Sequence, residues 1–296
     1  MLRLPARAAR SASLNGLVIT ADDFGLAAEV NDAVEMAHAK GVLTAASLMM
    51  AGPAAAQAVA IARRLPRLRV GLHLTLLEGP PAAPREEIPD LIDADGHLRS
   101  DMVALSFELL RPSVRRQLRR EIAAQFEAFR KTGLVLDHVN AHKHFHVHPL
   151  VAREVLDFAR QAGAPALRVP QEPAAVLAQV EGARQPSQGV MAPWCRLLRT
   201  RARRAGLTTP DAVFGLRWTG AMTAERLTGL MAHLPAGLTE IYTHPATADR
   251  FAGHARGYAY VAELTALTDP TVIEVMGRAG RRTGGFADFA AAGAAG

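Results

Sequence analysis

Short apolar runs alternate along the chain with longer stretches in which apolar residues recur every three or four positions. Runs of about four to eight apolar and β-branched residues are typical of buried strands, and the longer spacing is typical of amphipathic helices. The runs predict strands at 17–20, 43–50, 70–76, 135–139, 166–169, 212–216, 238–244 and 271–276. The periodic stretches predict helices at 27–41, 53–65, 113–131, 150–163 and 223–233, and they leave 78–100 and 170–207 irregular.

The repeated order of strand then helix decides the expected fold class. Such units give parallel strands with helices packed outside them. Seven or eight units in 296 residues predict an α/β protein with an irregular (β/α) barrel of parallel strands, in a single domain. A doubly wound open sheet is the alternative. We expect the domain to span 17–280 and a flexible tail to follow at 281–296. The basic segment 1–16 is either a disordered tail or the result of a start codon placed too early.

Composition narrows the class of protein. Apolar residues make up 49% of the chain, but no run is long enough to cross a bilayer, so we expect a soluble protein. Cys195 is the single cysteine, which excludes an intrachain disulfide and fits a reducing cytoplasm. The net charge of +6 would suit nucleic acid. Aromatic residues, at 5%, are too sparse for stacking on bases, so we expect no nucleic-acid partner.

Ionisable residues follow several of the predicted strands. Asp22 and Asp23 come after the first strand, His73 lies in the third, a histidine-rich tract follows the fourth, and His244 ends the seventh. Barrel enzymes place their catalytic groups where strands end and loops begin, on one face. We therefore expect these four segments to meet at one mouth of the barrel.

The aspartate pair in TADDFG has two interpretations. Adjacent carboxylates after a buried strand repel each other unless a cation or a shared proton relieves them. One of them could then bind a metal while the other moves protons. Asp also favours the N-cap of a helix, and a helix is predicted next. Two aspartates in succession, before Phe24 and Gly25, favour a site over a cap.

The tract HVNAHKHFHVHP at 138–149 holds five of the eleven histidines. In an extended chain His142, His144, His146 and His148 would share one face, whereas in a loop they would diverge. Histidine is the commonest metal ligand, so this density favours a metal site in which some imidazoles bind and others orient the ligands. A polar loop with only one or two functional residues is the alternative.

His73 and His244 each carry a weaker signal. His73 stands in an otherwise apolar strand, where a histidine is either a hydrogen-bonded core residue or a ligand. His244, in YTHPA, ends a strand before a proline, and near a metal it could protonate a leaving group. A surface position is its alternative.

Taken in order, TADDFG, GLHLTL, the H-x-x-x-H-x-H-x-H tract and YTHPA resemble the YdjC/ChbG family of carbohydrate deacetylases. The resemblance covers about 17–276. AASLMM, GLHLTLLEG, EIPDLIDADG, QFEAFRKTGL and DHVNAHKHFHVHP are most similar to its subgroup of hopanoid biosynthesis-associated proteins, HpnK. Ala246 stands where the family often has Gly.

The resemblance implies a hydrolase with a NodB/YdjC-like barrel that depends on one divalent metal ion, Zn²⁺ or Mg²⁺. By position, Asp23, His73 and His142 would bind the metal. Asp22 would be the general base and His244 the general acid. The residues expected to support the ligands or to contact the substrate are His138, His144, His146 and Arg168.

For the substrate, the subgroup implies an N-acetylglucosaminyl hopanoid glycolipid that loses acetate. Two alternatives stay open: a deacetylase of soluble chitooligosaccharides or another N-acetyl sugar, and a non-catalytic metal-binding protein. The segment 191–207 places Trp194 and Leu197 among arginines, so a peripheral contact with the inner face of the membrane is a further expectation. An ordinary solvated helix is its alternative, and a homodimer also stays open.

Overall fold

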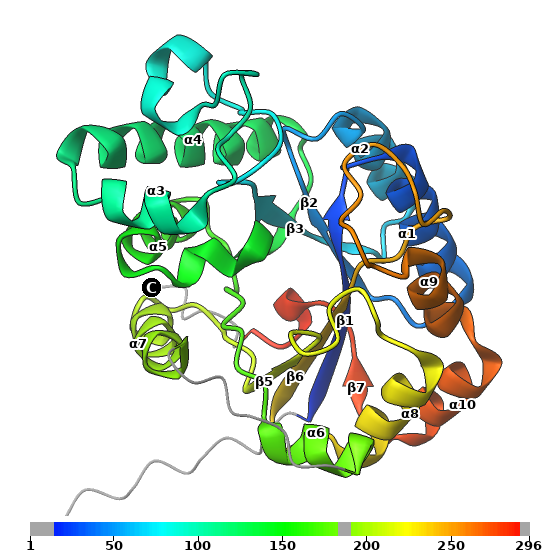
Figure 1. Ribbon diagram of the computed structural model, residues 1–296. Helices are drawn as coiled ribbons and strands as arrows, with labels where there is room; N and C mark the ends of the chain where they lie inside the picture. Colours follow the sequence, from blue (N-terminus) through cyan, green and yellow to red (C-terminus); the bar gives the residue numbers. More distant parts are fainter. Residues whose placement is uncertain (1–14, 183–190, 291–296) are drawn as a thin grey trace, which may run out of the picture.

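The strands of this protein run parallel and curl into a half-barrel within a single α/β domain (Figure 1). The computed structural model describes residues 15–182 and 191–290. The sheet has seven strands in the order β4-β3-β2-β1-β6-β5, with β7 beside β1, and every pair is parallel. The strands are β1 Gly16–Phe24, β2 Ala45–Leu48, β3 Arg69–Leu74, β4 Leu136–Ala141, β5 Ala212–Phe214, β6 Leu238–Thr243 and β7 Arg282–Thr283. The predicted fold class is confirmed.

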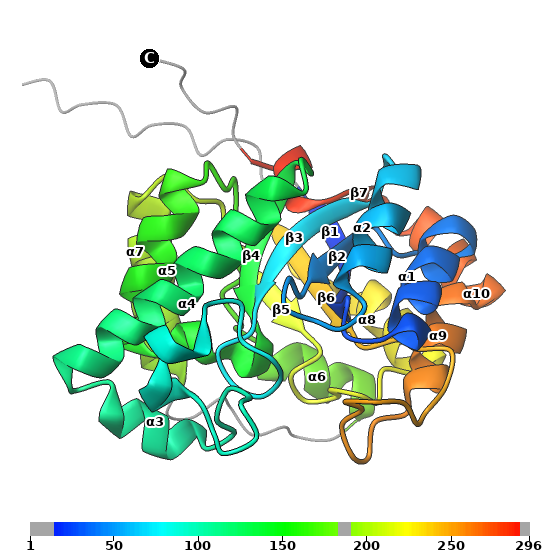
Figure 2. The same ribbon diagram turned by 90° about the horizontal axis from the view of Figure 1, so that it is seen from above.

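Helices cover the outside of the sheet. Figure 2 shows α4, α5 and α7 on one side of it and α1, α2, α9 and α10 on the other. The α-helices are α1 Ala28–Lys40, α2 Ala55–Arg64, α3 Met102–Glu108, α4 Pro112–Lys131, α5 Pro149–Gln161, α6 Ala174–Glu181, α7 Met191–Arg204, α8 Ala224–His233, α9 Tyr260–Thr268 and α10 Pro270–Arg278. β1 is buried along its whole length, since helices cover one face and the barrel interior covers the other. No helix in the described part of the chain is both long and apolar enough to span a membrane.

The predicted strand at 271–276 is wrong, because this segment lies in helix α10. Its β-branched residues favoured a strand. Asp269 overrides them: its side chain accepts hydrogen bonds from the backbone N–H groups of Thr271 and Val272, and Pro270 occupies the first turn. Val272 is the buried residue of this helix, so the apolar run serves one face rather than a strand.

Two irregular stretches hold more structure than predicted, and one predicted strand holds less. The stretch 170–207 contains α6 and α7, with 183–190 outside the described residues. Within 78–100 the chain forms the 3₁₀ turns η1 Arg85–Glu87 and η2 Pro89–Leu91. The segment 166–169 is not a strand, because it joins β4 through a single bridge between Val139 and Leu167.

The predicted flexible tail at 281–296 is wrong for residues 281–290, because this part of the chain is folded against the domain. β7 pairs with the start of β1 at Gly16 and Leu17, and the 3₁₀ turn η4 Phe286–Asp288 follows. Phe286 is fully buried. Burial of this aromatic ring fixes the segment, a long-range effect that the Gly- and Ala-rich sequence does not signal. Gly16 likewise belongs to β1 rather than to the N-terminal tail, while 1–14 and 291–296 lie outside the described residues.

Candidate metal and catalytic site

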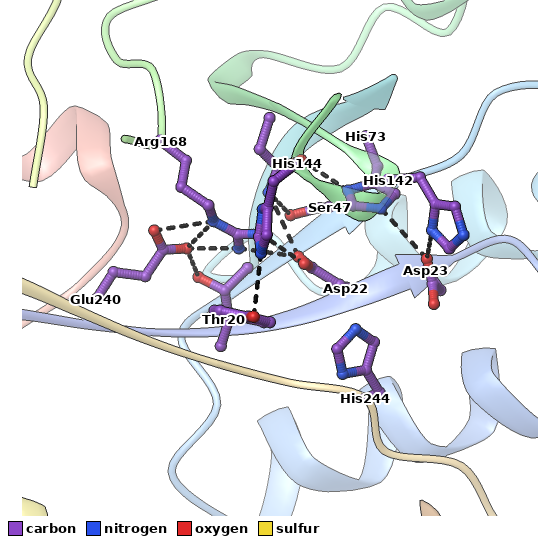
Figure 3. Close-up of polar contacts among 12 residues, drawn as sticks. Thr20, Asp22, Asp23, Ser47, His73, His142, His144, Arg168, Glu240 and His244 are labelled. Atoms are coloured by element: carbon purple, nitrogen blue, oxygen red, sulfur yellow. Dashed lines mark hydrogen bonds and ion pairs between the residues drawn. The ribbon is translucent and has the colours of Figure 1, made fainter. Parts of the chain in front are cut away.

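A bulge in β1 aims the two aspartates in different directions. Between Ala21 and Phe24 the register with β2 shifts, so that β1 carries one residue more than its neighbour. Bulges of this kind re-aim side chains near active sites. Asp23 takes the left-handed backbone conformation, with φ of 61°, which Asp tolerates better than most residues. Asp22 therefore points into the barrel interior, while Asp23 faces the histidines (Figure 3).

Asp23, His73 and His142 form one compact cluster. The Oδ1 atom of Asp23 lies 3.2 Å from Nε2 of His73 and 3.1 Å from Nδ1 of His142. Three potential ligand atoms of these residues lie within 4.8 Å of one another. One carboxylate oxygen and two imidazole nitrogens are a donor set that suits a divalent metal with open positions for substrate. The three residues expected to share a metal are thus brought together, and the set fits such an ion.

The cluster is built to receive positive charge. Burial would raise the pKa of Asp23, but His142 and His73 hold it well below its usual value. Burial would lower the pKa of His142, but Asp23 and Glu78 raise it to about 10. Two ring nitrogens directed at one carboxylate oxygen require a proton or a cation among them. Glu78, whose Oε2 lies 3.9 Å from Nε2 of His142 and whose other oxygen pairs with Lys143, adds a second carboxylate at the rim.

Asp22 takes part in a separate buried ion network. Arg168, which is completely buried, donates from Nη1 to Oδ2 of Asp22 at 2.5 Å and from Nη2 to Oδ1 at 2.9 Å. Its Nε and Nη2 also donate to Glu240, which accepts from the Thr20 hydroxyl as well. Burial would raise the pKa of Asp22, but Arg168 holds it far below its usual value. Asp22 is therefore a fixed, ionised carboxylate next to the cluster of Asp23, His73 and His142.

The remaining predicted histidines have different surroundings. His244 follows β6 and lies on the β6 side of the two aspartates, and its Nδ1 has no hydrogen-bond partner among the described residues (Figure 3). His144 contacts the Tyr242 hydroxyl through Nε2 at 3.1 Å. His146 contacts the backbone oxygen of Arg168 at 2.9 Å, and burial lowers its pKa to about 4. His138 lies below the site, paired with Asp137.

The histidine tract is neither extended nor a simple loop. It forms the 3₁₀ segment η3 His142–Val147, in which Lys143 and His144 have φ of 54° and 55°. This sharp bend turns His142 towards Asp23 and His144 towards β6, so their side chains do not share one face. His148 precedes α5, and Pro149 occupies the first turn of that helix.

The site opens into a cavity of about 640 Å³, a size typical of small-molecule pockets. Its polar floor includes Asp22, Asp23, His73, His142 and His244. The wall is mixed. It carries the apolar and aromatic side chains of Leu26, Met49, Leu77, Met191, Leu216, Tyr258 and Tyr260, together with polar ones that include Glu78, Lys143, Thr219, His254 and Arg256. Such a lining can hold a ligand that has both polar and apolar parts.

Glu263 of α9 supports the His244 loop and gives the fold a pH dependence. It accepts hydrogen bonds from the backbone N–H groups of Met222 and His244. Burial raises its pKa to about 7 from the ordinary 4.5. The folded state therefore binds a proton at Glu263 more tightly than the unfolded state does. The stability that this proton contributes is fully present below pH 4.5 and is lost as the pH rises to about 7 and above.

We therefore expect Glu263→Gln to flatten the pH dependence of stability. Between pH 5 and 8 the unfolding free energy of the wild type should fall by up to about 3 kcal/mol more than that of the variant. Urea titrations of both proteins at these two pH values measure the difference. Parallel pH curves would contradict the assignment of this effect to Glu263.

Several site residues were missed from the sequence. Glu240, Ser47 and Asn140 are buried polar residues on strands β6, β2 and β4. A charged residue in the middle of an otherwise apolar run, as in LTEIYT, is the signal that could have identified Glu240. Arg168 was expected to support the ligands or to contact the substrate, and the structure places it between Asp22 and Glu240.

The chain is similar in sequence to a family of known proteins over most of its length. Residues 16–278 match the family described as YdjC-like protein. A carbohydrate deacetylase of Geobacillus stearothermophilus is 31% identical over 266 residues, covering 89% of this chain and 93% of the relative. A carbohydrate deacetylase of Brevibacillus brevis is 30% identical over 257 residues, covering 85% and 90%.

A solved structure shares the fold. The crystal structure of an Enterococcus faecalis V583 protein, whose suggested role is cellobiose-phosphate cleavage, superimposes with a TM-score of 0.75 at 26% identity. The match covers 94% of this chain and 100% of that one. The half-barrel is thus a fold already observed by crystallography.

Proposed function

This chain belongs to the YdjC-like family, and on that premise we propose that it is a metal-dependent deacetylase that hydrolyses an N-acetylated sugar to the free amine and acetate. Relatives that match most of the chain are carbohydrate deacetylases. The observation that carries the proposal is the cluster of Asp23, His73 and His142 beside an ionised Asp22 on the floor of one cavity. This arrangement offers the two groups that metal-assisted amide hydrolysis uses, a site for a metal that polarises the carbonyl and a carboxylate that can take a proton from water.

Asp23, His73 and His142 would hold the metal. When bound, a divalent ion supplies polarisation of the amide carbonyl and acidification of a water molecule. Two imidazoles and one carboxylate suit Zn²⁺ better than Mg²⁺, which prefers oxygen ligands. Metal-free protein prepared with a chelator should therefore lose acetate release, and Zn²⁺ should restore it. Full activity after complete metal removal would contradict the proposal.

Asp22 would act as the general base. Because Arg168 binds both of its oxygens, the carboxylate keeps one orientation and remains ionised at neutral pH. Its role is to take the proton of the attacking water as the new C–O bond forms. The same ion pair weakens Asp22 as a base, and Glu240 offsets this by sharing the Arg168 charge.

His244 would act as the general acid on the nitrogen that leaves. Burial lowers the pKa of its ring, while Asp23 and Asp22 oppose the shift. A lower pKa makes the protonated ring a stronger proton donor. It also makes the neutral ring the main form at neutral pH, so His244 must receive its proton during turnover. The proton that Asp22 takes from water is the source that balances the reaction, since the amide nitrogen gains one hydrogen as the C–N bond breaks.

For the substrate we propose an N-acetylglucosaminyl glycolipid of the hopanoid type, and the soluble chitooligosaccharides are the competing class. Apolar side chains in the cavity wall, Leu26, Leu77 and Met191 among them, support a substrate with an apolar part. Acetate release from an N-acetylglucosaminyl hopanoid and from N,N′-diacetylchitobiose, at equal concentration, separates the two. A higher kcat/KM for the disaccharide would overturn the glycolipid proposal and leave the deacetylase proposal intact.

A glycolipid substrate also implies contact with a membrane surface through α7. Met191, Trp194 and Leu197 are 37%, 44% and 36% exposed on this arginine-rich helix. We expect the protein to float with anionic liposomes and Trp194→Ala to weaken flotation. Val135→Ala is the control, because Val135 is an exposed apolar residue in the loop before β4. Flotation that is equal in all three proteins would contradict a contact through α7.

A further inference from the structure

Three large apolar side chains project from one face of helix α3 and of the turn that follows it. Val103, Phe107 and Leu110 are 67%, 70% and 67% exposed. Residues three and four apart lie on the same face of a helix, so these side chains form one row. Contiguous apolar side chains on the surface of a soluble protein typically mark a place where another molecule binds. We refer to these three residues as the apolar ridge.

The apolar ridge is held in a fixed orientation by the rest of the domain. Leu105 and Leu109, on the opposite face of the helix, are at most 1% exposed. The side chain of Asp101 caps the start of α3. Beyond its end, Nη1 of Arg115 donates to the carbonyl oxygens of Leu109 and Leu110, at 3.0 Å each. Because α3 is anchored at both ends, its exposed side chains cannot turn inward without loss of these contacts.

The apolar ridge lies beside the rim of the cavity. Glu78 and Gly79 belong to the cavity wall. The backbone N–H of Glu78 donates to the carbonyl oxygen of Arg99 at 3.3 Å, and that of Leu98 donates to Gly79 at 2.8 Å. These bonds return the chain to the rim just before α3 begins. Figure 2 shows α3 beside the segment 78–100, on the side of the molecule opposite β7. A surface that contacts the ridge therefore lies next to the cavity mouth.

Positive charge gathers at the cavity end of the helices on this side of the sheet. Helix α4 begins soon after the ridge, α5 directly after the histidine tract, and α7 at Met191, which lines the cavity. None of these three helices has an acidic residue in its first turn. Arg116, Arg153 and Arg196 follow in their second turns and are exposed, without an ion-pair partner among the described residues. The arginines and the helix N-termini together attract anions to this end of the domain.

We propose that the apolar ridge inserts into the surface of a bilayer that contains anionic lipids, and that this contact sets the cavity mouth beside the lipid headgroups. Apolar side chains on a basic surface combine burial at the acyl boundary with attraction to anionic headgroups. The contact is additional to the one proposed for α7. Its purpose rests on the proposed glycolipid substrate, which would reach the cavity from the bilayer.

A second copy of this chain is the competing partner for the apolar ridge. Symmetric dimers use the same surface patch on both subunits. The segment 99–116, which carries the ridge, holds four arginines and two acidic residues. Pairing two copies through this segment would bring like charges together, whereas an anionic bilayer supplies the opposite charge. Charge complementarity therefore favours the bilayer.

Flotation with vesicles of equal parts phosphatidylcholine and phosphatidylserine measures the contact. Phe107→Ser combined with Leu110→Ser should lower the partition coefficient at least about tenfold, because two large apolar side chains no longer leave water. Val135→Ser is the matched control, since Val135 is 82% exposed in the loop before β4, at the other end of the strands from the cavity. It should leave partitioning unchanged. Equal partitioning of the double variant and the wild type would overturn the proposal.

A fluorescent probe distinguishes insertion of the ridge from binding through another surface. In Phe107→Cys a thiol-reactive dye should label position 107 but not Cys195, which is fully buried. The same vesicles should shift the emission of an environment-sensitive dye to shorter wavelength, and vesicles of phosphatidylcholine alone should shift it less. The dye on Val135→Cys should show no shift. Unshifted emission from position 107 in vesicle-bound protein would overturn insertion of the ridge.

Sedimentation velocity without lipid tests the second copy as the partner. We expect the wild type and the double variant Phe107→Ser, Leu110→Ser to have the same oligomeric state. A wild-type dimer that separates in the double variant, with vesicle partitioning unchanged, would assign the ridge to an interface between copies and overturn the proposal.

Acetate release by the double variant separates this proposal from the proposed function. We expect kcat/KM for the N-acetylglucosaminyl hopanoid in these vesicles to fall at least about tenfold, in parallel with partitioning. Hydrolysis of soluble N,N′-diacetylchitobiose should match that of the wild type, because the ridge lies outside the cavity lining. A wild type that releases acetate from neither substrate would contradict the proposed function, and flotation and the probe would still decide the contact.

Discussion

Asp23→Asn should abolish stable metal binding while leaving the fold intact. Asn tolerates the left-handed backbone conformation at this position, so the substitution removes charge without adding backbone strain. The two histidines would lose the carboxylate that both of them face. We expect Zn²⁺ affinity to fall by more than about 10²-fold, beyond the loss typical of residues behind the ligands.

Isothermal titration with Zn²⁺ measures this change. Asp95→Asn is the matched control, since Asp95 is an exposed loop residue. Its affinity should equal that of the wild type. Affinity that survives in Asp23→Asn would place the metal elsewhere and remove the basis of the proposed chemistry.

Asp22→Asn should have the opposite signature, with metal retained and turnover lost. Asp22 is not one of the three proposed metal ligands, and Arg168 keeps Glu240 as a charged partner in the variant. General acid–base assistance is typically worth about 10²–10⁴-fold, so kcat should fall by that factor. Acetate release by the zinc-loaded variant gives kcat, and elemental analysis of the same sample gives the metal content.

These two variants test whether Asp23 is a metal ligand and Asp22 is the general base. If Asp22→Asn lost its zinc as well, both carboxylates would belong to the metal site and the base would have to be sought elsewhere. If it kept normal turnover, Asp22 would serve only to neutralise Arg168. Urea unfolding of the variant is the necessary control, because removing one charge from a buried network can destabilise the fold.

The sequence predicted six of the seven strands approximately and the meeting of four distant segments, because these follow from short-range patterns and from one topological rule. Parallel strands with outside helices must bring their carboxyl ends to one edge. Asp23, His73 and His142 therefore came together as expected. Strand 271–276 failed because a capping aspartate and a proline outweigh β-branched residues, a local competition that apolar periodicity does not register.

The remaining errors concern geometry that periodicity does not encode. The left-handed backbone at Lys143 and His144 makes the histidine tract turn, and neither residue is one that usually adopts it. The buried contacts of Ser47 with His138 and Asn140 join strands β2 and β4, which are far apart in the chain. The position of Phe286 against His138 likewise joins segments that are far apart in the chain.

Crystals grown with Zn²⁺ and measured at the zinc absorption edge test the central claim most directly. We expect one strong anomalous peak per chain, about 2.0–2.2 Å from an Asp23 carboxylate oxygen, Nε2 of His73 and a ring nitrogen of His142. A peak bound to other histidines, or no peak at this cluster in zinc-saturated crystals, would contradict it.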